Sequence, residues 1–268
     1  MLTPSFTKGN LQKAKQFAIP IILIVPLPSG SVQPWTSWLV LRTPRSLICC
    51  TLPFSVRNDA VSELYNMDCV EGMKHYPDNY FDLAIVDPPY GIGGRFHTHH
   101  KEGQSQKHSL SKFTPTKWDD NIPDYEYFTE LFRVSKNQII WGGNYMTNFL
   151  PPSRCFIVWD KMTYIPSMSQ IELAWTSFDK NAQLKKINSN QINRIHPTQK
   201  PLKLYEWILS VYAEKGQRIL DTHVGSGNSR VACYLNGLDF VGFEINIEYC
   251  QLSEKLFEDA TSQQRLSF

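Results

Sequence analysis

Arg218-Ile-Leu-Asp221-Thr-His-Val-Gly225-Ser-Gly227-Asn-Ser229 is the stretch that decides the fold. Residues 218–221 favour a buried strand, the glycines favour a tight turn, and residues 228 to about 236 favour a helix. Such a turn lets a ligand approach the backbone and meet the helix N–H groups. Phe240-Val-Gly-Phe-Glu244 then predicts a strand that ends on a carboxylate. An acid at this point commonly binds ribose hydroxyls, so the two segments predict a nucleoside-type cofactor. NAD is disfavoured, because Arg230 occupies the third glycine position of the dinucleotide fingerprint.

The chain from residue 59 onward alternates predicted strands with predicted helices. Strands are expected at 63–67, 81–86, 138–141, 155–159, 172–178, 218–221 and 240–244. Helices are expected at about 69–75, 124–134, 202–214, 228–236 and 247–257. This alternation predicts one α/β domain over 59–268, with a mostly parallel central sheet and helices on both faces.

Residues 1–58 differ from the rest in composition. They contain no Asp or Glu, six Lys or Arg, and seven of the 17 prolines. Prolines interrupt the apolar run 17–28, which is too short for a transmembrane helix. Lysines ahead of this run imitate a signal peptide, but no small-residue cleavage site is evident. We therefore expect an atypical, poorly ordered N-terminal extension.

Charge and cysteine usage restrict the class of protein. The net charge is +2, and without residues 1–58 it is 21 − 25 = −4. A uniformly basic nucleic-acid-binding protein is excluded, so any such contact must be local. The six cysteines show no C-x-x-C spacing, which fits reduced thiols in a cytoplasmic protein.

Asp87-Pro88-Pro89-Tyr90 directly follows the apolar run 81–86. The prolines forbid continuation of the strand and fix an extended or turn backbone. A carboxylate, a carbonyl and an aromatic ring are thereby held at the carboxyl end of the strand, where open α/β sheets bind ligands. A plain proline-rich turn is the alternative for the tetrapeptide taken alone.

The tetrapeptide and the glycine turn together resemble the amino-directed DNA methyltransferases that use S-adenosylmethionine. The tetrapeptide precedes the glycine turn here, which is the motif order of the beta group. Four further segments are similar to that group, and the resemblance covers about residues 62–257: Asp68-Cys69, Ile140 to Tyr145, Val158 to Lys161, and His196 to Pro201. Thr222-His223 departs from the Pro-Phe often found after the aspartate of the turn.

The resemblance implies a Rossmann-like methyltransferase fold and methyl transfer to the exocyclic amino group of a flipped base. Its catalytic residues are Asp87, Pro88, Pro89 and Tyr90. Hydrogen bonds from the amino group to the Asp87 carboxylate and the Pro88 carbonyl would localise the nitrogen lone pair for direct attack on the sulfonium methyl. Tyr90 would stack on a base that has left the duplex. No cysteine nucleophile and no metal is required.

The resemblance also implies which residues would bind each part of the cofactor. Four residues of the turn would line its methionine and ribose: Asp221, Gly225, Ser226 and Gly227. Glu244 would bind the ribose hydroxyls, and Asp68 would lie on the adenine side. His196 to Pro201 would close over the methionine end. The complete cofactor-binding set is Asp68, Cys69, Asp87, His196, Thr198, Gln199, Lys200, Pro201, Asp221, Gly225, Ser226, Gly227, Asn228, Ser229 and Glu244.

Two polar segments are candidates for contacts with double-stranded DNA. Residues 92–121 predict a mobile loop that either faces DNA phosphates or is simply solvated. Metal binding by its histidines (His97, His99, His100, His108) is disfavoured, because no cysteine or acid has ligand spacing. Residues of about 161–193 are the candidate target-recognition region. The nucleic-acid-binding set is Arg95, Lys101, Lys107, Lys112, Lys117, Lys180, Lys185 and Lys186.

The expected activity is site-specific DNA methylation on adenine N6, because the aspartate form of the tetrapeptide is similar to the adenine enzymes. Cytosine N4 is the nearest alternative. An RNA or protein amide methyltransferase is disfavoured by motif order, and a binding module with a defunct site by the intact motifs. The resemblance leaves room for a homodimer and for a cognate restriction nuclease.

Overall fold

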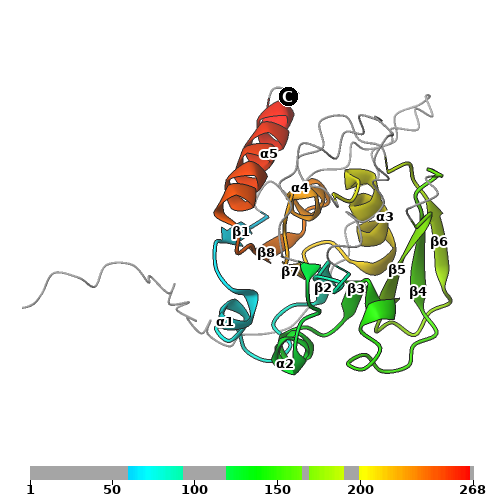
Figure 1. Ribbon diagram of the computed structural model, residues 1–268. Coiled ribbons are helices and arrows are strands. Elements are labelled where there is room, and N and C mark those ends of the chain that lie inside the picture. Colours follow the sequence, from blue (N-terminus) through cyan, green and yellow to red (C-terminus); the bar gives the residue numbers. More distant parts are fainter. Residues whose placement is uncertain (1–59, 93–118, 165–168, 190–198, 266–268) are drawn as a thin grey trace, which may run out of the picture. The chain divides into compact units, whose positions relative to one another are not determined.

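The computed structural model describes residues 60–92, 119–164, 169–189 and 199–265 (Figure 1). Their strands are β1 (Ser62–Tyr65), β2 (Leu83–Val86), β3 (Gln138–Trp141), β4 (Phe156–Asp160), β5 (Ile171–Thr176), β6 (Gln183–Lys186), β7 (Arg218–Asp221) and β8 (Asp239–Phe243). Their α-helices are α1 (Cys69–Met73), α2 (Tyr125–Val134), α3 (Leu202–Tyr212), α4 (Asn228–Leu235) and α5 (Ile247–Arg265), with a short 3-10 helix, η3 (Gly143–Tyr145). The N-terminal extension and most of the 92–121 loop lie outside the described residues.

One sheet with the strand order β1-β8-β7-β2-β3-β5-β4-β6 organises the domain. The five strands from β1 to β3 in this order are parallel, β5 is antiparallel to both of its neighbours, and β6 pairs parallel with β4. All four residues of β2 are buried, as expected of a strand covered on both faces. The predicted mostly parallel, Rossmann-like α/β fold is confirmed.

The sheet separates two hydrophobic cores. Leu83 and Ile85 of β2 face the core shared with α3 and α4, whereas Ala84 and Val86 face the core shared with α2. This is the two-residue alternation of a strand. Figure 1 shows α1 and α2 on one face of the sheet, with α3 and α4 on the other.

The crevice for a ligand lies between β7 and β2. The chain leaves β7 through α4 toward β8 on one side, and it leaves β2 through α2 toward β3 on the other side. The two strands are paired neighbours, with Ala84 opposite Leu220. Strand order therefore reverses between them, and ligands bind outside the carboxyl ends of strands at such a point.

Most predicted elements agree with the structure to within a few residues, with three differences. The first strand ends at Tyr65, because Asp68 already caps α1. The closing helix continues to Arg265 instead of ending near 257. The predicted recognition region contains β6, an edge strand that is absent from the expected strands. No helix among the described residues is long and apolar enough to cross a membrane.

Candidate active site

Asp87 leaves the carboxyl end of β2 with a partner on each carboxylate oxygen. The Tyr90 hydroxyl donates to its Oδ1 at 2.6 Å, and the Lys200 ammonium lies 2.5 Å from its Oδ2. Lys200 precedes α3, and its side chain is 1% exposed. The following Pro88 is buried, so the tetrapeptide backbone is fixed at the crevice. These contacts hold the Asp87 carboxylate in one orientation.

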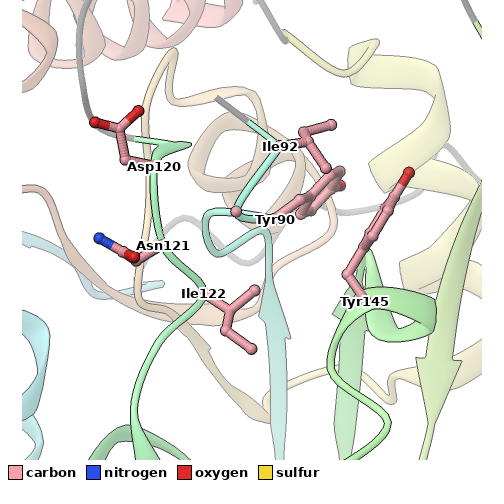
Figure 2. Close-up of a pocket in the computed structure, with 7 residues that line it drawn as sticks. Tyr90, Ile92, Asp120, Asn121, Ile122 and Tyr145 are labelled. Carbon is pink, nitrogen blue, oxygen red and sulfur yellow. The ribbon is translucent and has the colours of Figure 1, made fainter. Parts of the chain in front are cut away.

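The Tyr90 ring forms one wall of an open pocket of about 380 Å³ (Figure 2). It stacks on Tyr145, with ring centroids 5.4 Å apart and planes inclined by 17°. Gly142 touches the same ring: a Cβ there would lie 2.2 Å from it, and the φ of +67° is in the left-handed region. Glycine is therefore required at position 142 for the Tyr90 ring to lie where it does. Residues 120–122 complete the opposite side of the pocket.

Asp119 fixes the turn that follows the tetrapeptide. Its Oδ1 accepts hydrogen bonds from the backbone N–H groups of Tyr90 and Gly91 at 2.5 Å and 3.1 Å. The residue is buried, and this burial raises the pKa of its carboxyl group against the effect of the backbone hydrogen bonds. The segment before α2 is thereby joined to the catalytic turn.

A row of alternating charges extends from Asp87 toward β4. Glu172 of β5 lies between two cations, with Lys200 at 3.3 Å and Lys161 at 3.1 Å. Burial alone would lower the pKa of Lys200, but the carboxylates of Asp87 and Glu172 outweigh burial and raise it. Lys200 is therefore a charged, fully partnered ammonium.

The glycine turn after β7 encloses a buried acid, Asp221. The Ser229 hydroxyl donates to its Oδ2 at 2.6 Å, and the His223 backbone N–H donates to its Oδ1 at 3.0 Å. Burial, reinforced by the charges of Asp87 and Glu244, raises the pKa of Asp221 to about 7. Gly227 adopts φ +84°, and a Cβ there would lie 2.2 Å from the Ser253 hydroxyl of α5. The turn is thus closely packed against α5.

Two more acids continue this edge of the sheet. Glu244 follows β8 and accepts from the backbone N–H groups of Gly225 and Asn246, each at 2.8 Å. Asp68 follows β1 and caps α1 by accepting from Val70 N at 2.8 Å. Because β1 pairs with β8, these acids lie at neighbouring strand ends. Burial raises the pKa of the adjoining Cys69 thiol to about 12, so this thiol is neutral.

Thr222 and His223 form a polar relay at the turn. The Tyr127 hydroxyl lies 2.8 Å from Thr222 Oγ1, which lies 2.9 Å from His223 Nδ1. Burial lowers the pKa of His223 to about 4, although the charges of Asp87 and Asp68 oppose this shift. The imidazole is therefore neutral near pH 7. Hydrogen bonds here take the place of the Pro-Phe packing expected from the family pattern.

The described members of the predicted site line the carboxyl edge of β1, β8, β7 and β2. Asn228, Ser229 and Ser226 are buried around the glycine turn, and Gln199 is buried beside Lys200. Pro201 begins α3. His196, Thr198, Arg95, Lys101, Lys107, Lys112 and Lys117 lie outside the described residues, as do the four loop histidines. Within the described residues no cluster of His, Cys, Asp and Glu could hold a metal ion.

The three predicted recognition lysines that the structure describes lie at different places on the sheet. Lys180 precedes β6 at the amino edge of the sheet, away from Asp87, and it donates to Val211 O at 3.0 Å. Lys185 lies over the Trp207 ring of α3, 5.3 Å from its centroid. Lys186 ends β6 on the carboxyl edge, 4.0 Å from Asp160. Only Lys186 therefore shares an edge of the sheet with the pocket.

Sequence reasoning gave no role to Tyr145, Asp119, Lys161 or Glu172. Tyr145 and Lys161 lie in segments that resemble the family, and this signal was available. Asp119 lies within the polar loop, and Glu172 reads as an ordinary residue of a strand. Their contacts join segments far apart in sequence, so spacing alone could not reveal them.

Comparison with known proteins decides the class of this site. The DNA methylase family N6_N4_Mtase matches residues 140–255. Type II methyltransferase M2.MboI of Moraxella bovis is 23% identical over 258 residues, covering 78% of this chain and 92% of that protein. Type II methyltransferase M2.DpnII of Streptococcus pneumoniae is 26% identical over 168 residues, covering 62% and 59% of the two chains.

Over residues 140–255 this chain is similar to the DNA methylase family, and over most of its length it is similar to a type II DNA methyltransferase. Solved structures share the fold of this chain. TTHA0409 from Thermus thermophilus, complexed with S-adenosyl-L-methionine, has a TM-score of 0.50 at 18% identity, covering 75% of this chain and 94% of that chain. The cytosine-N4-specific PvuII DNA methyltransferase has a TM-score of 0.52 at 12% identity, with coverage of 76% and 92%. Together these likenesses support a DNA methyltransferase. The base is not distinguished by these likenesses.

Proposed function

We propose that this methyltransferase transfers a methyl group from S-adenosylmethionine to adenine N6 in double-stranded DNA. The observation that carries the proposal is the Asp87 carboxylate beside the Tyr90 pocket, on the strand next to the glycine turn of β7. A pocket of about 380 Å³ has room for a flipped base beside Tyr90, whose hydroxyl contacts the Asp87 carboxylate. The preference for adenine rests on the aspartate form of the tetrapeptide.

The cofactor fits the opposite side of the same crevice. Asp221 and Glu244 are buried acids at neighbouring strand ends, suited to an ammonium and to ribose hydroxyls. Gly225 and Gly227, with φ of +53° and +84°, allow the tight turn in which a cofactor could approach the backbone. S-adenosylmethionine supplies an electrophilic methyl group on a sulfonium.

The residues around Asp87 would raise the reactivity of a poor nucleophile. The adenine amino lone pair is delocalised into the ring. Its two N–H groups would donate to the Asp87 carboxylate and the Pro88 carbonyl, which favours a pyramidal nitrogen. The nitrogen–carbon bond forms as the sulfur–carbon bond breaks, and the nitrogen afterwards loses one proton. Holding both reactants in line supplies most of the acceleration, and no covalent enzyme intermediate is needed.

Nucleoside mass spectrometry tests this proposal directly. Double-stranded DNA is incubated with the protein and S-adenosylmethionine bearing a trideuterated methyl group, then digested to nucleosides. We expect labelled N6-methyladenine from the wild type and none from Asp87→Ala, whose cofactor affinity should stay within about threefold because the cofactor side remains intact. Labelled N4-methylcytosine alone would refute the adenine assignment. Label found only in RNA or protein would refute the DNA substrate.

A further inference from the structure

Lys200 has all the partners that a buried ammonium can use. Its Nζ lies 2.5 Å from Asp87 Oδ2, 3.3 Å from Glu172 Oε2 and 3.3 Å from the Tyr90 hydroxyl. An ammonium carries three N–H donors, so these acceptors account for each of them. The predicted role of this side chain at the methionine end of the cofactor would require it to give up one of these contacts.

The surroundings of Lys200 hold it in place from several directions. The Trp141 ring centroid lies 4.9 Å from its Nζ, close enough for a cation–π interaction. Lys161 neutralises the other oxygen of Glu172 at 3.1 Å. Two cations thus balance two carboxylates, which is the arrangement that makes buried charge tolerable.

Lys200 also touches the cofactor side of the crevice through its backbone. Its carbonyl accepts a hydrogen bond from the Asn228 side chain at 2.7 Å. Asn228 is the first residue of α4 and directly follows the glycine turn. Lys200 therefore contacts α4 through its backbone and the Asp87 carboxylate through its side chain.

We propose that Lys200 is a positioning residue for methyl transfer, acting through Asp87 and anchored by Glu172. The inference rests on the proposed function. Its ammonium holds the Asp87 carboxylate in one rotamer. Each carboxylate oxygen accepts two hydrogen bonds, so the contacts from Lys200 and Tyr90 leave capacity for the amino group of the base.

The test separates the rate of transfer from the affinity for the cofactor. Lys200→Met removes the charge at similar length, Glu172→Gln removes the anchor, and Lys203→Met is a matched control on an exposed lysine of α3. Single-turnover rates are measured with saturating DNA and S-adenosylmethionine, and cofactor Kd by calorimetry. We expect the rate to fall about 100-fold in Lys200→Met and about 10-fold in Glu172→Gln, with cofactor Kd within about threefold and the control unchanged.

Two results would overturn the proposal. Loss of cofactor affinity with a normal rate at saturation would assign Lys200 to the cofactor, and a normal rate with normal affinity would make its ion pair merely structural. Urea unfolding checks each variant. If Lys200→Met does not fold, the Glu172→Gln rate decides, since that side chain is 26% exposed. Wild-type transfer to cytosine would refute only the adenine assignment, because the variants can then be compared on that base.

Discussion

Asp221 is a buried carboxylic acid that the cofactor should ionise. Its pKa of about 7 means that the free protein holds a proton there over part of the population at neutral pH. A bound ammonium lowers the pKa of a neighbouring carboxyl group, so binding should expel that proton. We predict that cofactor affinity rises between pH 6 and pH 8, because less of the free protein then has to lose a proton.

Calorimetry in buffers of different ionisation enthalpy measures the released proton. Asp221→Asn should bind more weakly, with no proton release attributable to this site. The same raised pKa means that the contribution of Asp221 to stability is full below pH 3.8 and is lost as the pH rises through about 7. Equal proton release in the wild type and Asp221→Asn would contradict the assignment.

Gly142 is the residue on which the Tyr90 ring depends. A Cβ at this position would lie 2.2 Å from the ring, and the backbone φ is +67°. We predict that Gly142→Ala displaces Tyr90 and lowers transfer about 100-fold, while cofactor affinity stays nearly unchanged.

The matched control for Gly142 is Gly237→Ala. Gly237 follows α4 with the same φ of +67°, so it imposes the same left-handed backbone on alanine. Both variants should lose about 1–2 kcal/mol of stability, but only Gly142→Ala should lose transfer. Equal activity of the two variants would show that the position of the Tyr90 ring does not depend on glycine at position 142.

At the scale of elements, Asp68 has two roles to separate: it caps α1, and it is a predicted cofactor-binding residue. Asp68 caps this five-residue helix through Val70 N and Glu71 N. We predict that Asp68→Ala costs about 1 kcal/mol in the free energy of unfolding, whereas Asp68→Asn keeps the cap and most of the stability. Urea unfolding measures both variants.

Cofactor affinity of the same pair separates the two functions of Asp68. If its charge also serves the cofactor, Asp68→Asn should bind S-adenosylmethionine more weakly although its stability is retained. An Asp68→Asn variant with normal affinity would leave the residue as a cap alone.

Elements with a strong local pattern could be predicted from the sequence. β7 and α4 surround the glycine turn, and β3 is a short apolar run before two glycines, so their ends agree with the prediction. β6 could not be predicted, because Gln183–Lys186 is short and mostly polar. Its residues alternate between half-buried and exposed, and the strand pairs with β4. Long-range pairing creates that strand, and local propensity does not.

At the scale of the whole molecule, two motifs that are far apart in the sequence lie next to each other at one edge of the sheet. The tetrapeptide leaves β2 and the glycine turn leaves β7, and the parallel pairing of these strands brings both to the same edge. Sequence reasoning could place both motifs there, because parallel strands end on one edge. It could not give the ion pairs of Lys200 and Glu172 or the stacking of Tyr90 on Tyr145, which depend on side chains from β3, β5 and α3.

The recognition of DNA belongs to the same scale. Lys186 lies on the edge that carries the pocket, whereas Lys180 does not. The central claim, however, concerns the chemistry at Asp87 and holds for any recognition sequence.

Modified-base sequencing of DNA from cells that express the protein tests this claim most directly. We predict N6-methyladenine in one recurrent sequence context with the wild type, and none in that context with Asp87→Ala expressed at an equal level. Wild-type DNA without N6-methyladenine, or with the same modification in Asp87→Ala cells, would contradict it.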